Sequence, residues 1–124
     1  MKRTPLPKRR TPIRRSGPPK QRNAKRKASE FARCYGSKAR VAFVASLYCA
    51  CGCGRTPCEN AHTITGGIGR KGPYQSIIPL TANCHRRQHV EGWEAIGMTR
   101  SAADLCSQYT EWCWQAHLNR GTEP

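Results

Sequence analysis

No apolar run in this chain approaches the length of a membrane span, which takes about 20 residues. The first residues, from Met1 onward, are basic and contain no apolar segment of the kind found in secretory signal peptides. We therefore expect no signal peptide, no membrane contact and no oxidising compartment. The sequence predicts a cytoplasmic protein.

Acidic residues are almost missing from the first 40 residues, which hold fifteen Lys and Arg against one acid, Glu30. The remaining residues hold seven Lys and Arg against six Asp and Glu, so the excess positive charge belongs to the N-terminal part. Repeated X-Pro steps and like-charge repulsion predict a disordered basic tail over residues 1–28. One domain is expected to follow over residues 29–124.

The expected partner of this tail is a polyanion, and nucleic acid is favoured because cations gain affinity by releasing counterions from phosphates. Membrane insertion is disfavoured because the tail has few large apolar residues. A segment that only aids solubility is the alternative. The tail residues expected to contact phosphates are Arg9, Arg10, Arg14 and Arg15.

Disulfides are not expected, although the chain has eight cysteines. Four of them lie close together, at Cys49, Cys51, Cys53 and Cys58, and Cys84 directly precedes a histidine. Short-spaced thiols in a small chain indicate disulfides or a metal, and the missing signal peptide favours metal. Because a domain of about 90 residues is near the lower limit for a self-stabilising core, a structural zinc would offset the deficit.

The expected fold class is α+β. Residues 37–48 are predicted to be helical, with one face formed by Val41, Val44, Ala45 and Tyr48 and with Lys38 and Arg40 off that face. A shorter helix is expected over residues 29–35. Short strands are predicted near residues 60–65 and 76–80, and a further helix begins at about Ala82.

The C-terminal segment predicts one more helix, in which Ser101 and Asp104 have capping-box spacing. An apolar face with helical period is predicted to lie in the core and comprises Leu105, Tyr109, Trp112, Cys113 and Ala116. Packing, rather than base stacking, is the expected role of Trp93 and Trp114. The side chains expected to be free thiols or surface groups are Cys34, Cys106, Cys113 and His117.

His85 and His89 lie four residues apart in the helix predicted from Ala82, and His62 lies on the first predicted strand. Positions i and i+4 project from one helix face, so two imidazoles can hold one cation while the third remains free for chemistry. A solvated histidine pair on a surface helix is the alternative. The neighbouring cysteines and arginines favour the metal site.

Several basic residues lie near these histidines in the sequence. Arg70 and Lys71 belong to a glycine-rich loop over residues 66–73, which would let backbone and cations approach a phosphate closely. The loop lacks Walker spacing, so a plain hairpin connection is the alternative. Arg86 and Arg87 are further candidates for phosphate contact, with solvated surface charge as the alternative. Such contacts recognise the nucleic-acid backbone rather than its base sequence.

The order strand, loop, strand, helix, with one histidine on the first strand and a pair on the helix, resembles the HNH endonuclease superfamily. The chain is also similar to small phage and prophage HNH proteins, which include the Ref-type, RecA-dependent recombination-enhancement nucleases. The segments that carry the resemblance are Tyr35-Gly36-Ser37-Lys38, Cys58-Glu59-Asn60-Ala61-His62-Thr63, Gly69-Arg70-Lys71, Ile78-Pro79-Leu80 and Cys84-His85 with His89.

The resemblance implies a small ββα-metal finger with flanking helices and a zinc knuckle. It also implies metal-dependent hydrolysis of DNA phosphodiester bonds, with His62 as general base and with His85 and His89 holding Mg²⁺, Mn²⁺ or Zn²⁺. A monomer in the cytoplasm of a bacterial host is expected, with single- or double-stranded DNA and a RecA-type recombinase as partners. The alternatives are a non-catalytic zinc-bearing DNA-binding module and a recombination-accessory protein.

Three positions depart from the superfamily pattern. Ala61 stands where a metal ligand commonly precedes the strand histidine, Ser76 stands near the place of the central Asn, and Thr81 replaces the first Cys of a Cys-x-x-Cys pair. A four-thiolate zinc site would therefore join Cys84 to three of the four knuckle cysteines. The sequence does not determine which three, and we predict Cys49, Cys53 and Cys58.

Overall fold

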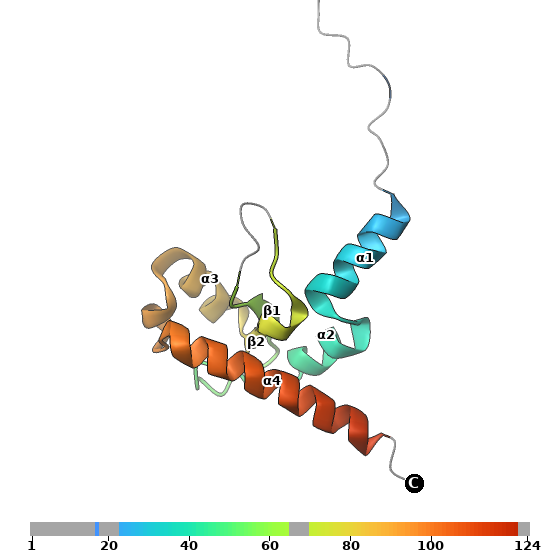
Figure 1. Ribbon diagram of the computed structural model, residues 1–124. Helices are drawn as coiled ribbons and strands as arrows, with labels where there is room; N and C mark the ends of the chain where they lie inside the picture. The colour runs from blue at the N-terminus through green and yellow to red at the C-terminus, as the bar shows by residue number, and fades with distance from the viewer. Residues whose placement is uncertain (1–16, 18–22, 65–69, 122–124) are drawn as a thin grey trace, which may run out of the picture.

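A computed structural model of the 124-residue chain describes residues 17, 23–64 and 70–121. It confirms the α+β class, with helices around a small two-stranded sheet (Figure 1). In chain order the elements are α1 (Ala24–Tyr35), α2 (Lys38–Ala45), β1 (Glu59–His62), the 3-10 turn η1 (Tyr74–Ser76), β2 (Ile77–Leu80), α3 (Ala82–Glu91), the 3-10 turn η2 (Trp93–Ile96) and α4 (Arg100–Arg120).

β1 and β2 pair in an antiparallel register that sets Ala61 opposite Ile78 and His62 opposite Ile77. All four residues of β2 are buried. Because side chains alternate between the two faces of a strand, the burial of Ala61 in the core places the side chain of His62 on the other face of β1. The sheet therefore holds the histidine at the edge of the core.

The core joins this sheet to the cysteine-rich segment and to the start of α4. Its buried members are Cys49, Cys58, Ala61, Ile78, Leu80, Ile96, Met98 and Ala103. Trp93 packs against this cluster. Trp114 is also buried, with its ring centroid 5.4 Å from that of Phe43, so the predicted packing role of both tryptophans is confirmed.

Helix α1 begins earlier than the predicted domain boundary at residue 29. Asn23 caps it by accepting a hydrogen bond from the Lys25 amide at 2.9 Å, so residues 24–28, predicted to be disordered, are helical. Local capping therefore outweighs the repulsion between the basic side chains in this stretch. Of the twelve residues of α1, only Cys34 is buried. The tail residues Arg9, Arg10, Arg14 and Arg15 lie outside the described part of the chain.

Helix α2 ends at Ala45, before the predicted end at Tyr48, which is 73% exposed. The prediction that Arg40 lies off the buried face is wrong, because Arg40 is 0% exposed. Its Nε and Nη2 atoms donate to Oε2 of Glu111 at 3.2 and 2.7 Å. Its guanidinium also lies 5.1 Å from the ring centroid of Tyr74. A carboxylate from a distant helix thus allows a cation in the interior.

Helix α4 is capped by Thr99, which accepts from the Ala102 amide at 3.0 Å, rather than by the predicted pair Ser101 and Asp104. The predicted core face is also wrong, because Leu105, Tyr109 and Trp112 are 65, 64 and 65% exposed. The residues that α4 buries are instead Ala103, Ser107, Thr110 and Trp114. Because most of these side chains are small, the helix can approach the sheet closely. The larger side chains on the face of Leu105, Tyr109 and Trp112 would prevent this approach.

Candidate functional site

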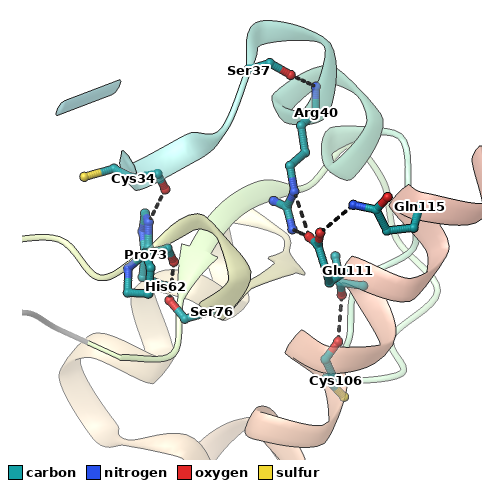
Figure 2. A network of polar contacts seen from close by, with 10 residues as sticks. Cys34, Ser37, Arg40, His62, Pro73, Ser76, Cys106, Glu111 and Gln115 are labelled. Carbon is teal, nitrogen blue, oxygen red and sulfur yellow. Dashed lines mark hydrogen bonds and ion pairs between the residues drawn. The ribbon is translucent and has the colours of Figure 1, made fainter. Parts of the chain in front are cut away.

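His62 is fixed by the main chain at the end of α1. Its Nε2 atom lies 2.6 Å from the carbonyl oxygen of Cys34, and Figure 2 shows this contact as a dashed line. Because a carbonyl can only accept, Nε2 carries the proton and donates, which leaves the lone pair of a neutral ring on Nδ1. The Tyr35 ring meets the imidazole edge to face, with centroids 5.3 Å apart. The histidine is thus held in one tautomer with Nδ1 available to accept a proton.

The electrostatic surroundings of His62 keep it neutral. Burial lowers the pKa of its imidazole, and electrostatic interactions with Lys71, His85 and Arg33 lower that pKa further. The hydrogen bond to the Cys34 carbonyl acts in the opposite direction, but the pKa stays below the ordinary value. At pH 7 the ring is therefore in the form that a general base requires.

His85 and His89 face each other from successive turns of α3. Their Nε2 atoms are 3.0 Å apart. Two imidazoles bound to one zinc-sized cation would have nitrogens about 3.0 to 3.4 Å apart, given metal–nitrogen bonds of about 2.1 Å. The helix thus brings the two histidines of the predicted pair together, at a separation that a hydrogen bond between the rings also gives.

Glu59 orients His85 and was not predicted to take part in the site. Its Oε2 atom lies 2.6 Å from Nδ1 of His85, so Nδ1–H donates to the carboxylate and Nε2 is left as the ligand atom. Metal-binding histidines commonly donate their second ring N–H to a carboxylate in this way. The only sequence signal was an acid three positions before the strand histidine, and its contact with α3 depends on the packing of β1.

The turn that leads into β2 is braced by Ser76. Its hydroxyl donates to the Pro73 carbonyl at 2.7 Å (Figure 2), and its own carbonyl accepts from the Thr63 amide and hydroxyl, both at 2.9 Å. Gly72 leaves no room for a side chain, since an added Cβ would lie 2.0 Å from the Ile64 carbonyl oxygen. Ser76 therefore fixes the return of the chain towards His62.

A second candidate site is formed by sulfur. The Sγ atoms of Cys49, Cys51, Cys53 and Cys84 all lie within 4.8 Å of one another. The separation is 3.2 Å between Cys49 and Cys51 and 3.4 Å between Cys51 and Cys84, close to the roughly 3.8 Å expected around a tetrahedral zinc. These four residues, here called the thiol cluster, could hold a metal ion such as zinc.

The predicted ligand set needs one correction, because Cys51 rather than Cys58 completes the thiol cluster. The Cys58 thiol is buried and donates to the Arg55 carbonyl at 3.8 Å. Its position follows from its place directly before β1, which directs it into the core. All eight cysteines are free, and Cys34, Cys106 and Cys113 are buried or partly exposed, as predicted.

Hydrogen bonds prepare one member of the thiol cluster for ionisation. Burial raises the pKa of Cys49, but backbone hydrogen bonds from Thr81 and Cys51 outweigh it and bring that pKa down to about 7. The Thr81 amide donates to this sulfur at 3.4 Å. Burial and the neighbouring Cys49 raise the pKa of Cys51. Thr81 thus supplies a main-chain donor to the thiol cluster.

The residues predicted to contact phosphate lie in different environments in the structure. Arg33 Nη1 donates to the Lys71 carbonyl at 3.0 Å, and the Lys71 ammonium donates to the Tyr35 hydroxyl, so this loop cation lies against α1 near His62. Arg70 and Arg86 are exposed. Arg87 donates to the Ala95 carbonyl at 2.8 Å, which ties it to η2.

Comparisons with protein-family models, with curated proteins and with solved structures found no match to this chain. Among the described residues, no helix has both the length and the apolarity needed to cross a membrane.

Proposed function

We propose that the chain is a metal-dependent endonuclease of the HNH type that hydrolyses DNA phosphodiester bonds. The observation that carries this proposal is the state of His62, a neutral imidazole whose tautomer is set by the Cys34 carbonyl. A general base with a free Nδ1 can take the proton of a water that attacks phosphorus. The carboxylate-oriented pair His85 and His89 supports the proposal from α3.

The residues would divide the work as follows. His62 Nδ1 accepts the proton of the attacking water, and the Cys34 carbonyl stabilises the resulting imidazolium through Nε2–H. His85 and His89 would hold a divalent cation, with Glu59 fixing the tautomer of His85. When bound, such a cation supplies Lewis-acid stabilisation of charge on the phosphate and on the leaving oxygen. Lys71 adds positive potential beside His62.

The thiol cluster would have a separate, structural role. Cys49 lies in the core and Cys84 lies in the first turn of α3, so one zinc would join the knuckle to the helix that carries the histidine pair. Closed four-ligand zinc sites of this kind contribute directly to folding. In this proposal the zinc keeps α3 in register with β1, and no zinc chemistry is required at the scissile bond.

A cleavage assay tests the proposal. Full-length protein is incubated with supercoiled plasmid, linear duplex and a single-stranded oligonucleotide, each with Mg²⁺, with Mn²⁺ and with neither. Cleavage that requires the metal and is lost in His62→Ala is expected. If no DNA form is cut with either metal while DNA is still bound, the nuclease proposal is wrong.

One observation favours the second candidate, a zinc-bearing DNA-binding or recombination-accessory module without catalysis. The position before His62 is Ala61, which is 1% exposed in the core and offers no ligand. Within the described residues, the histidine pair then presents two protein ligands to a cation. A protein that binds DNA or a RecA-type recombinase in pull-down assays, but never cuts DNA, would meet this description.

A further inference from the structure

A cationic hollow lies along one side of α1. It has a volume of about 660 Å³ and is lined by Arg26, Ser29, Glu30, Arg33 and Arg70. The four lining residues from α1 lie at positions i, i+3, i+4 and i+7, so they form one stripe of the helix. Arg70 faces this stripe from the segment before η1. Three guanidinium groups and one carboxylate therefore surround a space open to solvent.

The charges in this hollow are poorly compensated. Among the described residues, the side chains of Arg26, Arg70 and Glu30 have no hydrogen-bond or ion-pair partner, and the Arg33 side chain uses one nitrogen on the Lys71 carbonyl. Three guanidinium groups around one unpaired carboxylate leave a net positive charge, which an anion with several acceptor oxygens would neutralise. A phosphate group matches the planar donor geometry of arginine.

The hollow is next to the proposed catalytic histidine. Arg33 is directly followed by Cys34, whose carbonyl contacts His62 at 2.6 Å. The Arg33 side chain also contacts Lys71, which lies against Tyr35 beside the same histidine. One strand of duplex DNA carries a phosphate about every 3.4 Å along the helix axis. A strand with one phosphate at His62 thus has neighbouring phosphates within reach of the hollow.

We propose that this hollow binds a backbone phosphate of the DNA strand next to the scissile bond, and that α1 is part of the DNA-binding surface. The choice of DNA as the source of the phosphate rests on the proposed function. Figure 1 shows that α1 extends away from the body of the protein. Contacts here recognise the backbone and are independent of base sequence.

Charge variants of the full-length protein test this assignment without divalent metal, so that binding is measured without cleavage. Arg26→Gln and Arg70→Gln should each weaken DNA binding about three- to tenfold. Each should also reduce the slope of log K against log salt by about 0.7 to 0.9. Glu30→Gln should strengthen binding about two- to threefold, because it removes a repulsive charge near the phosphate. Arg100→Gln, the same charge change outside the hollow, is the control.

The opposite signs expected for Arg26→Gln and Glu30→Gln separate a phosphate site from a structural role, which would weaken binding in both variants. Thermal melting identifies any variant that fails to fold, and all four altered side chains are exposed. If Arg26→Gln and Arg70→Gln bind DNA like Arg100→Gln, the hollow is not a phosphate site, and metal-dependent cleavage by the unaltered protein would still support the nuclease. If the variants behave as expected but the unaltered protein never cuts DNA, the hollow stands and the nuclease proposal fails.

Discussion

The imidazole of His62 donates from Nε2 to the carbonyl oxygen of Cys34 at 2.6 Å, so a main-chain atom of α1 sets the protonation pattern of a residue on β1. The same β-strand supplies Glu59, which sets the tautomer of His85 on α3. Two histidines with different expected roles are therefore oriented by two different kinds of acceptor. That difference makes their roles experimentally separable.

Replacing the histidines one at a time should distinguish the general base from a metal ligand. His62→Ala is expected to lower the cleavage rate by about 10² to 10⁴, the usual contribution of a general base, with DNA affinity nearly unchanged. His89→Ala should abolish cleavage at ordinary metal concentrations, but excess Mn²⁺ should partly restore it. His117→Ala, an exposed histidine stacked on Trp114, is the control. Near-normal cleavage by His62→Ala would show that His62 is not the general base.

Glu59→Gln tests the carboxylate that orients His85. An amide can still accept from Nδ1, but it no longer raises the basicity of the ring, so affinity for the divalent cation should fall about 10- to 100-fold. The measurement is the Mn²⁺ concentration that gives half-maximal cleavage. Glu94→Gln, an exposed acid, should leave that concentration unchanged. Equal metal requirements for both variants would show that Glu59 is only a surface acid.

Stability should depend on pH through His62. Burial lowers its pKa below the ordinary value of about 6.5, so between these two pKa values the unfolded chain binds more protons than the folded one. The free energy of unfolding is therefore expected to fall as the pH falls through this window. Urea denaturation between pH 7.5 and 5 should show a smaller fall for His62→Gln. Parallel curves for the two proteins would contradict the lowered pKa.

The thiol cluster predicts about one zinc per chain after dialysis, and a strong chelator should unfold the domain. Cys53→Ser should lose the metal and unfold at a lower temperature, although the exposed Cys53 side chain itself packs against little. Cys58→Ser is the matched variant that should keep its zinc, because its sulfur lies outside the cluster. Elemental analysis of these variants and of Cys51→Ser identifies the zinc ligands. If Cys58→Ser lost its zinc while Cys51→Ser kept it, Cys58 rather than Cys51 would be the fourth ligand.

The ion pair between α2 and α4 should be important for stability. Glu111→Gln leaves the Arg40 cation at 0% exposure without its counter-charge, and Nη1 already has no partner among the described residues. A loss of about 3 kcal/mol in the free energy of unfolding is expected. The double variant Arg40→Met, Glu111→Leu should recover part of it, because no charge is then buried. A Glu111→Gln protein as stable as the unaltered chain would refute this.

The strands, α3 and the histidine pair could be predicted because their signals are local. The run Ile77–Leu80 is apolar and buried, and His85 and His89 are brought together by helical periodicity alone. The buried face of α4 could not be predicted, since its sequence offers a more apolar face, around Leu105 and Trp112, that remains exposed. Which face is buried depends on the space left by β2 and η1.

Long-range partners explain the other errors. Nothing near Arg40 in the sequence announces Glu111, 71 positions away. The choice of Cys51 over Cys58 depends on where β1 begins, and the short spacings of the four knuckle cysteines suit several ligand sets equally well. The contact between the Cys34 carbonyl and His62 could not be predicted for a different reason. Every residue has a carbonyl, and only the packing of α1 brings this one to His62.

Helix α1 buries a single side chain, yet its last turn holds His62. Segments with so few buried contacts open at a lower free energy than the whole domain, and native-state hydrogen exchange detects such partial opening. Each opening of α1 would release the imidazole while the sheet and the thiol cluster stayed folded. No side-chain replacement at position 34 removes the carbonyl itself, so the orientation of His62 depends on the local equilibrium between folded and frayed α1.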